Sequence, residues 1–144
     1  MRPVTDDVDT EGFFSLAADG KLGVATCGAC RAVLHPPTGI CPACGAVDVV
    51  WRAVAPTGSL VTWTVVERQV NEAFPTPYTV VLVALDEVPE ACLVGQLPGR
   101  HELVPGEPMV AHFDDDSVLP QWRRVDDRAA SPHPPAGQTQ GDGA

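Results

Sequence analysis

The sequence predicts a mainly β protein with a short N-terminal helix, a zinc ribbon and a C-terminal five-stranded OB-fold barrel. Three observations support this fold class. Four of the five cysteines form two pairs of identical spacing. Five short apolar or β-branched runs follow them, separated by Pro, Gly and Asp. One short amphipathic segment precedes them. We therefore expect a helical segment over 1–20, the ribbon over 21–54, the barrel over 55–125 and a disordered tail over 126–144.

The N-terminal helix is expected over residues 10–19, "TEGFFSLAAD". Thr10 can cap its N-terminus and Gly20 can end it. An apolar face is formed by Phe13, Phe14, Leu16 and Ala17. A helix this short is marginal by itself, so it must pack on another surface.

The cysteine pattern is C-x2-C-x10-C-x2-C, formed by Cys27, Cys30, Cys41 and Cys44. Two such knuckles can place four thiolates around one zinc ion, with each sulfur about 2.3 Å from the metal. We expect Gly28 and Gly45 to let the backbone turn tightly beside the sulfurs. Four cysteine ligands leave no position for water or substrate, so one structural Zn²⁺ per chain is expected. A ribbon that has lost its metal and a redox-active C-x2-C pair are the alternatives.

Two further residues could be confused with metal ligands. Cys92, in "EACLVGQL", is expected to be a buried strand residue, because a free cysteine packs as a small apolar side chain. His35 lies between the two knuckles and is expected to be a loop residue. Neither is included in the predicted metal site.

The barrel strands are expected where apolar or β-branched residues are bounded by turn-forming residues. Five short strands without a long helical pattern favour a small Greek-key barrel, of which the OB-fold is the five-stranded form. The expected strands cover 59–68, 78–85, 91–97, 108–113 and 118–125.

Composition excludes several classes of partner and location. The net charge of −10 argues against nucleic acid and anionic membranes, which need clustered basic residues. Residues 55–125 carry four basic and ten acidic side chains, so single-stranded nucleic-acid binding by the ribbon and barrel is the least favoured alternative. No apolar run is long enough to span a membrane. The acidic N-terminus lacks a signal-peptide pattern, so we expect a cytoplasmic protein.

The order of motifs resembles the bacterial and archaeal family called domain of unknown function thirty-five. The resemblance covers about residues 10–125 and rests on "FF…L…GKL", the two knuckles, "TWTVV", "PYTVVLVAL" and "PGEPMVAHF". It implies a helical N-terminus, a rubredoxin-like zinc ribbon and an OB-fold. It also implies an accessory role beside thiolase-superfamily enzymes that act on acyl-CoA, including thiolases, acyltransferases and steroid side-chain-cleaving aldolases.

No catalytic residue is predicted in the chain itself. The sequence contains no nucleophile-elbow motif and no Gly-rich phosphate loop. We therefore expect a non-catalytic subunit of a thiolase or aldolase complex in steroid or lipid metabolism. Direct acyl-CoA binding or channelling by the barrel is the alternative.

The N-terminal helix is the expected contact with the partner. A small ribbon offers little apolar surface to cover Phe13, Phe14 and Leu16, so these side chains are candidates for anchoring an interface. The expected partner is a thiolase-fold homodimer that binds two copies of this chain, with acyl-CoA near the interface. The alternative is that the helix folds back onto the ribbon or the barrel.

Overall fold

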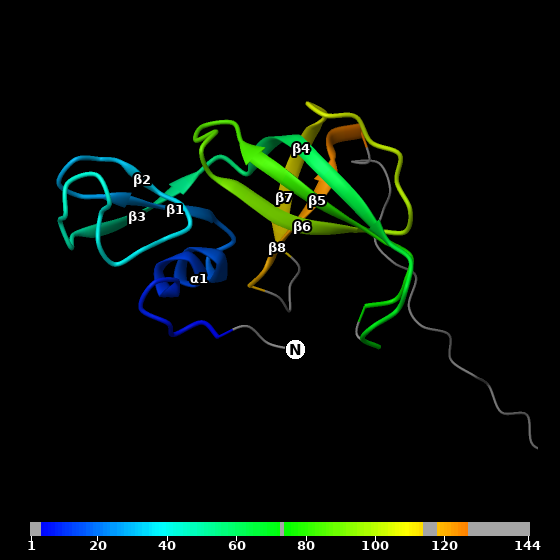
Figure 1. Ribbon diagram of the computed structural model, residues 1–144, viewed down its shortest axis with the longest axis horizontal. Coiled ribbons are helices and arrows are strands. Elements are labelled where there is room, and N and C mark those ends of the chain that lie inside the picture. The colour runs from blue at the N-terminus through cyan, green and yellow to red at the C-terminus, as the bar shows by residue number, and fades with distance from the viewer. Residues whose placement is uncertain (1–3, 73, 114–117, 127–144) are drawn as a thin grey trace, which may run out of the picture.

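The computed structural model describes residues 4–72, 74–113 and 118–126. It is mainly β with one short helix, and it has the predicted order of helix, ribbon and barrel (Figure 1). The predicted fold class is therefore confirmed. The elements are α1 (Glu11–Ala18), β1 (Leu22–Cys27), β2 (Val33–Leu34), β3 (Val49–Val54), β4 (Thr57–Val66), β5 (Tyr78–Leu85), β6 (Cys92–Pro98), β7 (Pro108–Phe113) and β8 (Pro120–Arg124).

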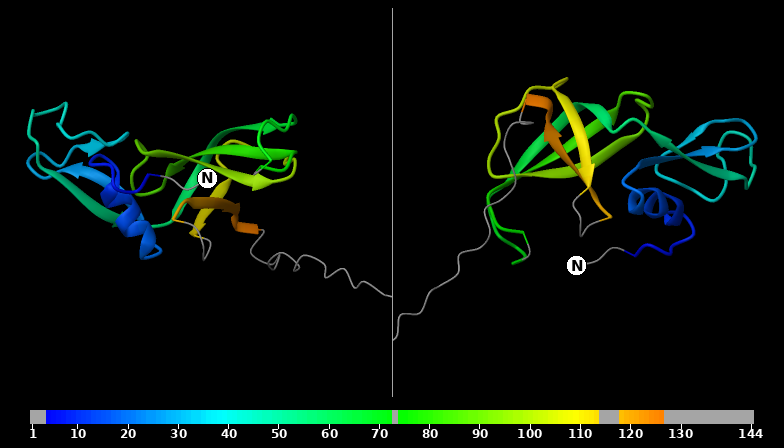
Figure 2. Two further views of the ribbon diagram at one scale, coloured as in Figure 1. Left: turned by 90° about the horizontal axis from the view of Figure 1, so that it is seen from below. Right: turned by 180° about the vertical axis from the view of Figure 1, so that it is seen from behind.

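The ribbon is a three-stranded antiparallel sheet in the order β2-β1-β3. Its central strand β1 pairs with β3 along its whole length, from Leu22 opposite Val54 to Cys27 opposite Val49. The sheet lies at one end of the long axis of the molecule and the barrel lies at the other (Figures 1 and 2). The first knuckle, 27–30, begins at the last residue of β1, and the second knuckle, 41–44, lies before β3 in the sequence.

Helix α1 begins and ends close to its predicted limits, but its N-terminal cap differs from the expectation. The Thr10 side chain makes no capping hydrogen bond. The backbone amides of Thr10 and Glu11 donate instead to the Asp7 carbonyl, at 3.0 and 2.7 Å. At the other end Gly20 has a φ of +70°, and the amides of Gly20 and Lys21 donate to the last turn. Gly20 therefore ends the helix as predicted, in a left-handed conformation that favours glycine.

The barrel is a five-stranded antiparallel sheet in the order β6-β5-β4-β7-β8. Its two outer strands, β6 and β8, contact each other. The Gln96 amide of β6 donates to the Gln121 side-chain oxygen of β8 at 3.0 Å. A Cβ atom on Gly95 of β6 would lie 2.5 Å from Cδ1 of Trp122, so glycine is required where β6 and β8 pack together. This order and closure are those of a partly open, five-stranded OB-fold barrel.

The strands at 78–85 and 108–113 have the predicted limits, whereas the other three are shifted. The largest difference is at β4, which begins at Thr57 and not at residue 59. Gly58, which lies before the predicted strand, is paired on both sides, opposite Leu85 and Met109. A Cβ atom there would lie 2.4 Å from the Ala84 carbonyl oxygen. Gly58 therefore permits a close approach of three strands.

The ribbon and the barrel share one hydrophobic core. The ribbon residues Leu22, Val24 and Val54 belong to the same buried cluster as Val81 and Trp122 of the barrel. Phe13 of α1 and Val33 of β2 pack against the edge of that cluster. A smaller second cluster of Ala25, Cys27, Leu34 and Cys41 surrounds the knuckles. Burial of apolar surface thus joins the two parts of the chain directly.

Polar contacts reinforce this junction. His35 Nε2 lies 2.8 Å from the carbonyl oxygen of Cys92, at the start of β6. Glu87 lies between β5 and β6 in the sequence. Its carboxylate accepts a hydrogen bond from the Ala55 amide at 3.1 Å and lies 3.8 Å from the Arg52 guanidinium of β3. These contacts fix the ribbon against the hairpin that joins β5 to β6.

The expected tail lies outside the described residues, except for Asp126. Within the described residues, α1 is far too short to cross a bilayer, and no other helix has the length and apolar character to do so.

Candidate metal centre

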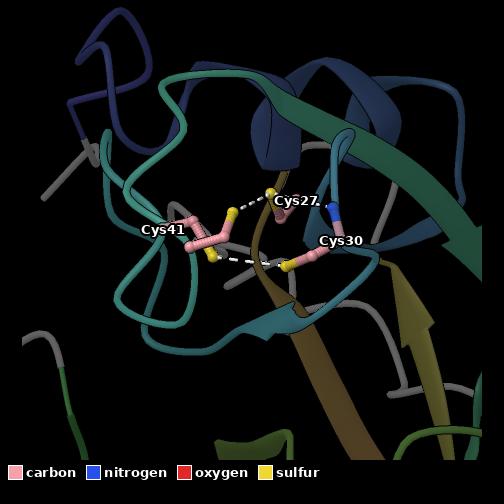
Figure 3. Close-up of side chains that lie close together, drawn as sticks. Cys27, Cys30 and Cys41 are labelled. Carbon is pink, nitrogen blue, oxygen red and sulfur yellow. Dashed lines mark hydrogen bonds between the residues drawn. The ribbon is translucent and has the colours of Figure 1, made fainter.

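The four predicted cysteines converge on one point between the knuckles. Their sulfur atoms all lie within 4.8 Å of one another. The Cys27 and Cys44 sulfurs are 3.6 Å apart, and so are those of Cys30 and Cys41. Figure 3 shows the labelled side chains pointing toward one another from the two loops. The structure therefore brings together all four residues that sequence spacing selected.

The two knuckles repeat one hydrogen-bonding pattern. In the first, the Cys27 amide donates to the Ala32 carbonyl at 2.9 Å, and the Arg31 amide donates to the Cys27 carbonyl at 2.8 Å. The second has the same bonds, from Cys41 to the Ala46 carbonyl and from Gly45 to the Cys41 carbonyl, each at 2.8 Å. In both knuckles, the amide of the residue after the second cysteine thus donates to the carbonyl of the first cysteine.

This repeat corrects the expected role of Gly28. Gly45 does have the expected left-handed conformation, with a φ of +75°, but the equivalent residue of the first knuckle is Arg31, with a φ of +64°. Gly28 has different neighbours. Its amide donates to the Asp48 carbonyl at 2.9 Å, and a Cβ atom on it would lie 2.1 Å from the Asp48 carboxylate. Arg31 was missed, although its position matches that of Gly45 in the repeated C-x2-C motif.

Replacing Arg31 with glycine should stabilise the protein. A residue with a side chain is disfavoured in the left-handed region by roughly 1–2 kcal/mol, and part of that gain is offset by the greater freedom of glycine in the unfolded chain. We expect the Arg31→Gly variant to gain about 1 kcal/mol in free energy of unfolding, measured by denaturant titration with zinc in excess. The matched change Gly45→Ala should lose a similar amount. A loss of stability in Arg31→Gly would contradict this interpretation.

The thiols influence one another's pKa values. Hydrogen bonding from the Cys30 amide is the main cause that lowers the pKa of Cys27, to about 7. The Ala46 backbone lowers the pKa of Cys44, but the sulfurs of Cys30 and Cys27 outweigh it and raise that pKa to about 12. The Cys44 thiol therefore stays protonated near neutral pH when no cation lies beside it. A divalent cation among the four sulfurs would favour its thiolate form.

The donor set and its geometry fit zinc. In a tetrahedron with Zn–S bonds of about 2.3 Å, the sulfurs are about 3.8 Å apart, close to the spacing found here. The Cys30 amide, 3.5 Å from the Cys27 sulfur, can donate to a thiolate. All four donors come from the chain, so such a site has no open position for substrate. Its role would be to hold the knuckles together.

The predicted partner-binding residues are largely occupied within the chain. The Phe13 ring packs edge-on against Phe14 and Trp51, with centroid distances of 5.3 and 6.4 Å. Leu16 lies over Gly23, where a Cβ atom would be 2.6 Å from Leu16 Cδ1. The expectation that the ribbon offers too little apolar surface was therefore wrong, because glycine in β1 and Trp51 in β3 make room for the helix. Phe13, Phe14 and Leu16 are all half-buried, and Phe14 also lies beside a surface hollow of about 550 Å³.

Cys92 and His35, which were not included in the predicted metal site, lie outside the cluster of four sulfurs. Cys92 is half-buried and not buried as expected, because it is the first residue of β6, next to a turn. Its sulfur lies 3.9 Å from the Pro89 carbonyl. His35 is a loop residue, as expected, and it contacts the barrel through the Cys92 carbonyl. Sequence patterns gave no signal for this contact, which joins residues 57 positions apart.

Comparison with known proteins agrees with this geometry. Residues 14–50 match the family model for the ChsH2 rubredoxin-like zinc ribbon domain, and residues 51–114 match that for the ChsH2 C-terminal OB-fold domain. A chain of the solved Ltp2-ChsH2(DUF35) aldolase superposes with a TM-score of 0.75 at 32% sequence identity. The match covers 85% of this chain and 98% of that chain. This protein belongs to the ChsH2 family. The resemblance inferred from its motifs is thus confirmed.

A longer curated relative matches most of this chain over part of its own length. It is named probable enoyl-CoA hydratase alpha subunit, from Thermomonospora curvata, and is 34% identical over 122 residues. The match covers 80% of this chain but only 37% of the relative. The chain described here thus spans about a third of that relative's length. With a ChsH2 zinc ribbon domain and four adjoining cysteines, the predicted zinc cofactor is confirmed.

Proposed function

We propose that this chain is a non-catalytic, zinc-binding subunit that docks on a thiolase-fold enzyme and supports its acyl-CoA chemistry. The enzyme would be a thiolase, an acyltransferase or an aldolase that cleaves steroid side chains. The observation that carries this proposal is the match to almost the whole of one chain in the Ltp2-ChsH2(DUF35) aldolase. A fold and sequence likeness of that extent supports a similar role in a complex. A homodimeric enzyme with one copy on each side, in the cytoplasm, is the arrangement we propose.

The contacts of potential catalytic groups support a non-catalytic role. His35 and His101 each lie 2.8 Å from a backbone carbonyl, those of Cys92 and Pro98. Four of the five thiols converge in the candidate metal centre. These groups therefore have structural contacts in place of the paired nucleophile and base that acyl transfer requires.

The proposal is tested by reconstitution with a thiolase-fold enzyme. The chain should be co-expressed with a candidate thiolase-superfamily enzyme, and the two should co-elute in size-exclusion chromatography with equal stoichiometry. Turnover of acyl-CoA substrates should require the enzyme, and the chain alone should show none. Turnover by the purified chain alone, abolished by a substitution within it, would overturn the proposal. So would the absence of a complex.

Within this proposal, the N-terminal helix remains the docking element, and Phe14 is the side chain that we expect to anchor the partner. Phe13 and Leu16 pack against the ribbon sheet, whereas Phe14 borders the 550 Å³ hollow. A partner side chain can enter that hollow and bury Phe14 without displacing α1. Phe13 and Leu16 would then support the helix from beneath.

Replacing Phe14 with serine should weaken the complex by about 2 kcal/mol, or roughly 30-fold in Kd, because a buried aromatic anchor is lost. Isothermal titration calorimetry with the purified enzyme measures this. Val104→Ser is the matched control, because Val104 is 67% exposed and lies between β6 and β7 in sequence. The melting temperature of Phe14→Ser should stay close to that of the parent. Unchanged affinity in Phe14→Ser would place the docking surface elsewhere.

A second candidate function, direct binding of acyl-CoA, is favoured by a hollow of about 390 Å³ that is lined by the barrel and by Phe13 of α1. Its lining includes Tyr78 and Val80 of β5, Val94 of β6, Phe74 and Leu119, and none of its lining residues carries a charge. It could hold an acyl group, but it offers no cation for the CoA phosphates. Titration of the isolated chain with decanoyl-CoA and with CoA separates the two functions. Binding of decanoyl-CoA alone, lost in Val94→Asp, would support this candidate.

Hydratase activity is not proposed for the chain. The relative named as a hydratase subunit extends well beyond the region matched here, which amounts to 37% of its length.

A further inference from the structure

The four cysteines differ in exposure in a way that pairs them across the knuckles. Cys27 and Cys41 are buried, whereas Cys30 and Cys44 are exposed. The sulfur of each exposed cysteine lies 3.6 Å from the sulfur of a buried cysteine of the other knuckle, Cys44 from Cys27 and Cys30 from Cys41. An oxidant in solution therefore meets one cysteine of each pair first, and a second sulfur lies within 4 Å of the first.

We propose that the candidate metal centre is also a site of oxidation by hydroperoxides, which joins Cys27 to Cys44 and Cys30 to Cys41. The products are two disulfides between the knuckles. Sulfurs 3.6 Å apart must approach to about 2.05 Å to form a bond, so a movement of about 1.5 Å is needed.

The first step takes place at an exposed cysteine such as Cys44, which would be a thiolate when it holds a metal ion. Its sulfur attacks the peroxide, an S–O bond forms, and the O–O bond breaks. The sulfur loses two electrons and becomes a sulfenic acid, and the departing oxygen takes up a proton to leave as water or an alcohol.

In the second step the Cys27 thiolate attacks the Cys44 sulfur. The S–S bond forms, the S–O bond breaks, and hydroxide leaves and is protonated to water. A second equivalent of peroxide converts Cys30 and Cys41 in the same way. Each equivalent removes two of the four thiolates, so the four cysteines could no longer hold a metal ion with a closed set of ligands.

The pairing decides what becomes of the ribbon. A disulfide within one knuckle would leave the two loops unconnected once the metal is lost. A disulfide between knuckles would keep the end of β1 joined to the segment before β3, in place of the metal. The ribbon sheet, and the Leu22 and Val24 side chains that it contributes to the shared core, would then stay in position.

Proteolysis can distinguish these pairings, because Arg31 separates the knuckles in the sequence. Trypsin cleavage after Lys21, Arg31 and Arg52 gives one peptide, 22–31, with Cys27 and Cys30, and another, 32–52, with Cys41 and Cys44. The zinc-loaded full chain should be treated with hydrogen peroxide, alkylated, digested and analysed by mass spectrometry without reduction. A chromophoric chelator should record metal release in parallel. The Cys92→Ser chain serves as the background, so that the fifth cysteine cannot pair.

We expect peptides 22–31 and 32–52 joined by two disulfides as the main oxidised product, with zinc released at the same rate. Electron-transfer fragmentation should assign Cys27–Cys44 and Cys30–Cys41. Mixing ¹⁵N-labelled and unlabelled chains should give no mixed-isotope pair, because both bonds form within one chain. Separate peptides that each lack two hydrogens, a Cys30–Cys44 bond, bonds between chains, or sulfinic and sulfonic acids as main products would each overturn the proposal.

Discussion

Replacing Cys41 with serine should abolish stable zinc binding and unfold the ribbon, and with it much of the barrel. Structural zinc contributes roughly 10–16 kcal/mol to the folding of small metal-stabilised domains, more than the whole stability of a typical domain. Loss of the ribbon sheet would also remove Leu22, Val24 and Val54 from the core that they share with the barrel. The expected effect therefore extends beyond the knuckles.

This result is measured by elemental analysis of zinc together with circular dichroism and tryptophan fluorescence. Cys92→Ser is the matched control, because Cys92 lies in the barrel and outside the cluster of four sulfurs. It should retain one zinc per chain and a cooperative unfolding transition. A Cys41→Ser variant with full zinc content, or one in which the barrel stays folded with native fluorescence, would contradict the expectation.

Replacing Trp122 with alanine should lower the free energy of unfolding by about 3–5 kcal/mol, because a large buried ring leaves a cavity. Trp122 is 1% exposed and is the largest fully buried side chain among the described residues. It fills the space over Gly95, where β6 and β8 meet. Denaturant titration followed by circular dichroism measures the loss.

Trp122→Phe separates the contribution of the ring from that of the indole nitrogen. Within the described residues, the buried Trp122 Nε1 has no hydrogen-bond partner, so removing it leaves no other polar group unsatisfied. The phenylalanine variant should therefore lose much less stability than the alanine variant. Equal losses in the two variants would show that the barrel does not depend on the volume of this ring.

The sequence allowed good prediction wherever short motifs determine the structure. The C-x2-C spacing fixes the positions of the four cysteines, because each knuckle is a local turn with its own hydrogen bonds. The nearly continuous apolar run at 78–85, bounded by turn-forming residues, predicts the limits of β5 without error. Gly20 was recognised as the end of α1 for the same local reason.

Contacts between distant residues could not be predicted in the same way. Gly12 and Gly23 look like ordinary small residues in the sequence. Yet a Cβ atom on Gly12 would lie 2.1 Å from the Trp51 ring, and one on Gly23 would meet Leu16. These glycines allow α1 to lie on the ribbon sheet, which reduces the number of apolar side chains left for a partner. Only the register of β1 and β3 and the position of the helix reveal this.

The common core of ribbon and barrel limits how the chain can be divided or recombined. A cut at residues 54–55 separates the two units along the sequence, but it would leave Leu22, Val24 and Val54 on one fragment and their packing partners on the other. Each fragment would then expose a complementary apolar surface. A relative's ribbon grafted onto this barrel should be accepted only if its residues at these three positions have similar size and shape. We therefore expect the ribbon and the barrel to be inherited together, and to stay together when genes are exchanged between lineages.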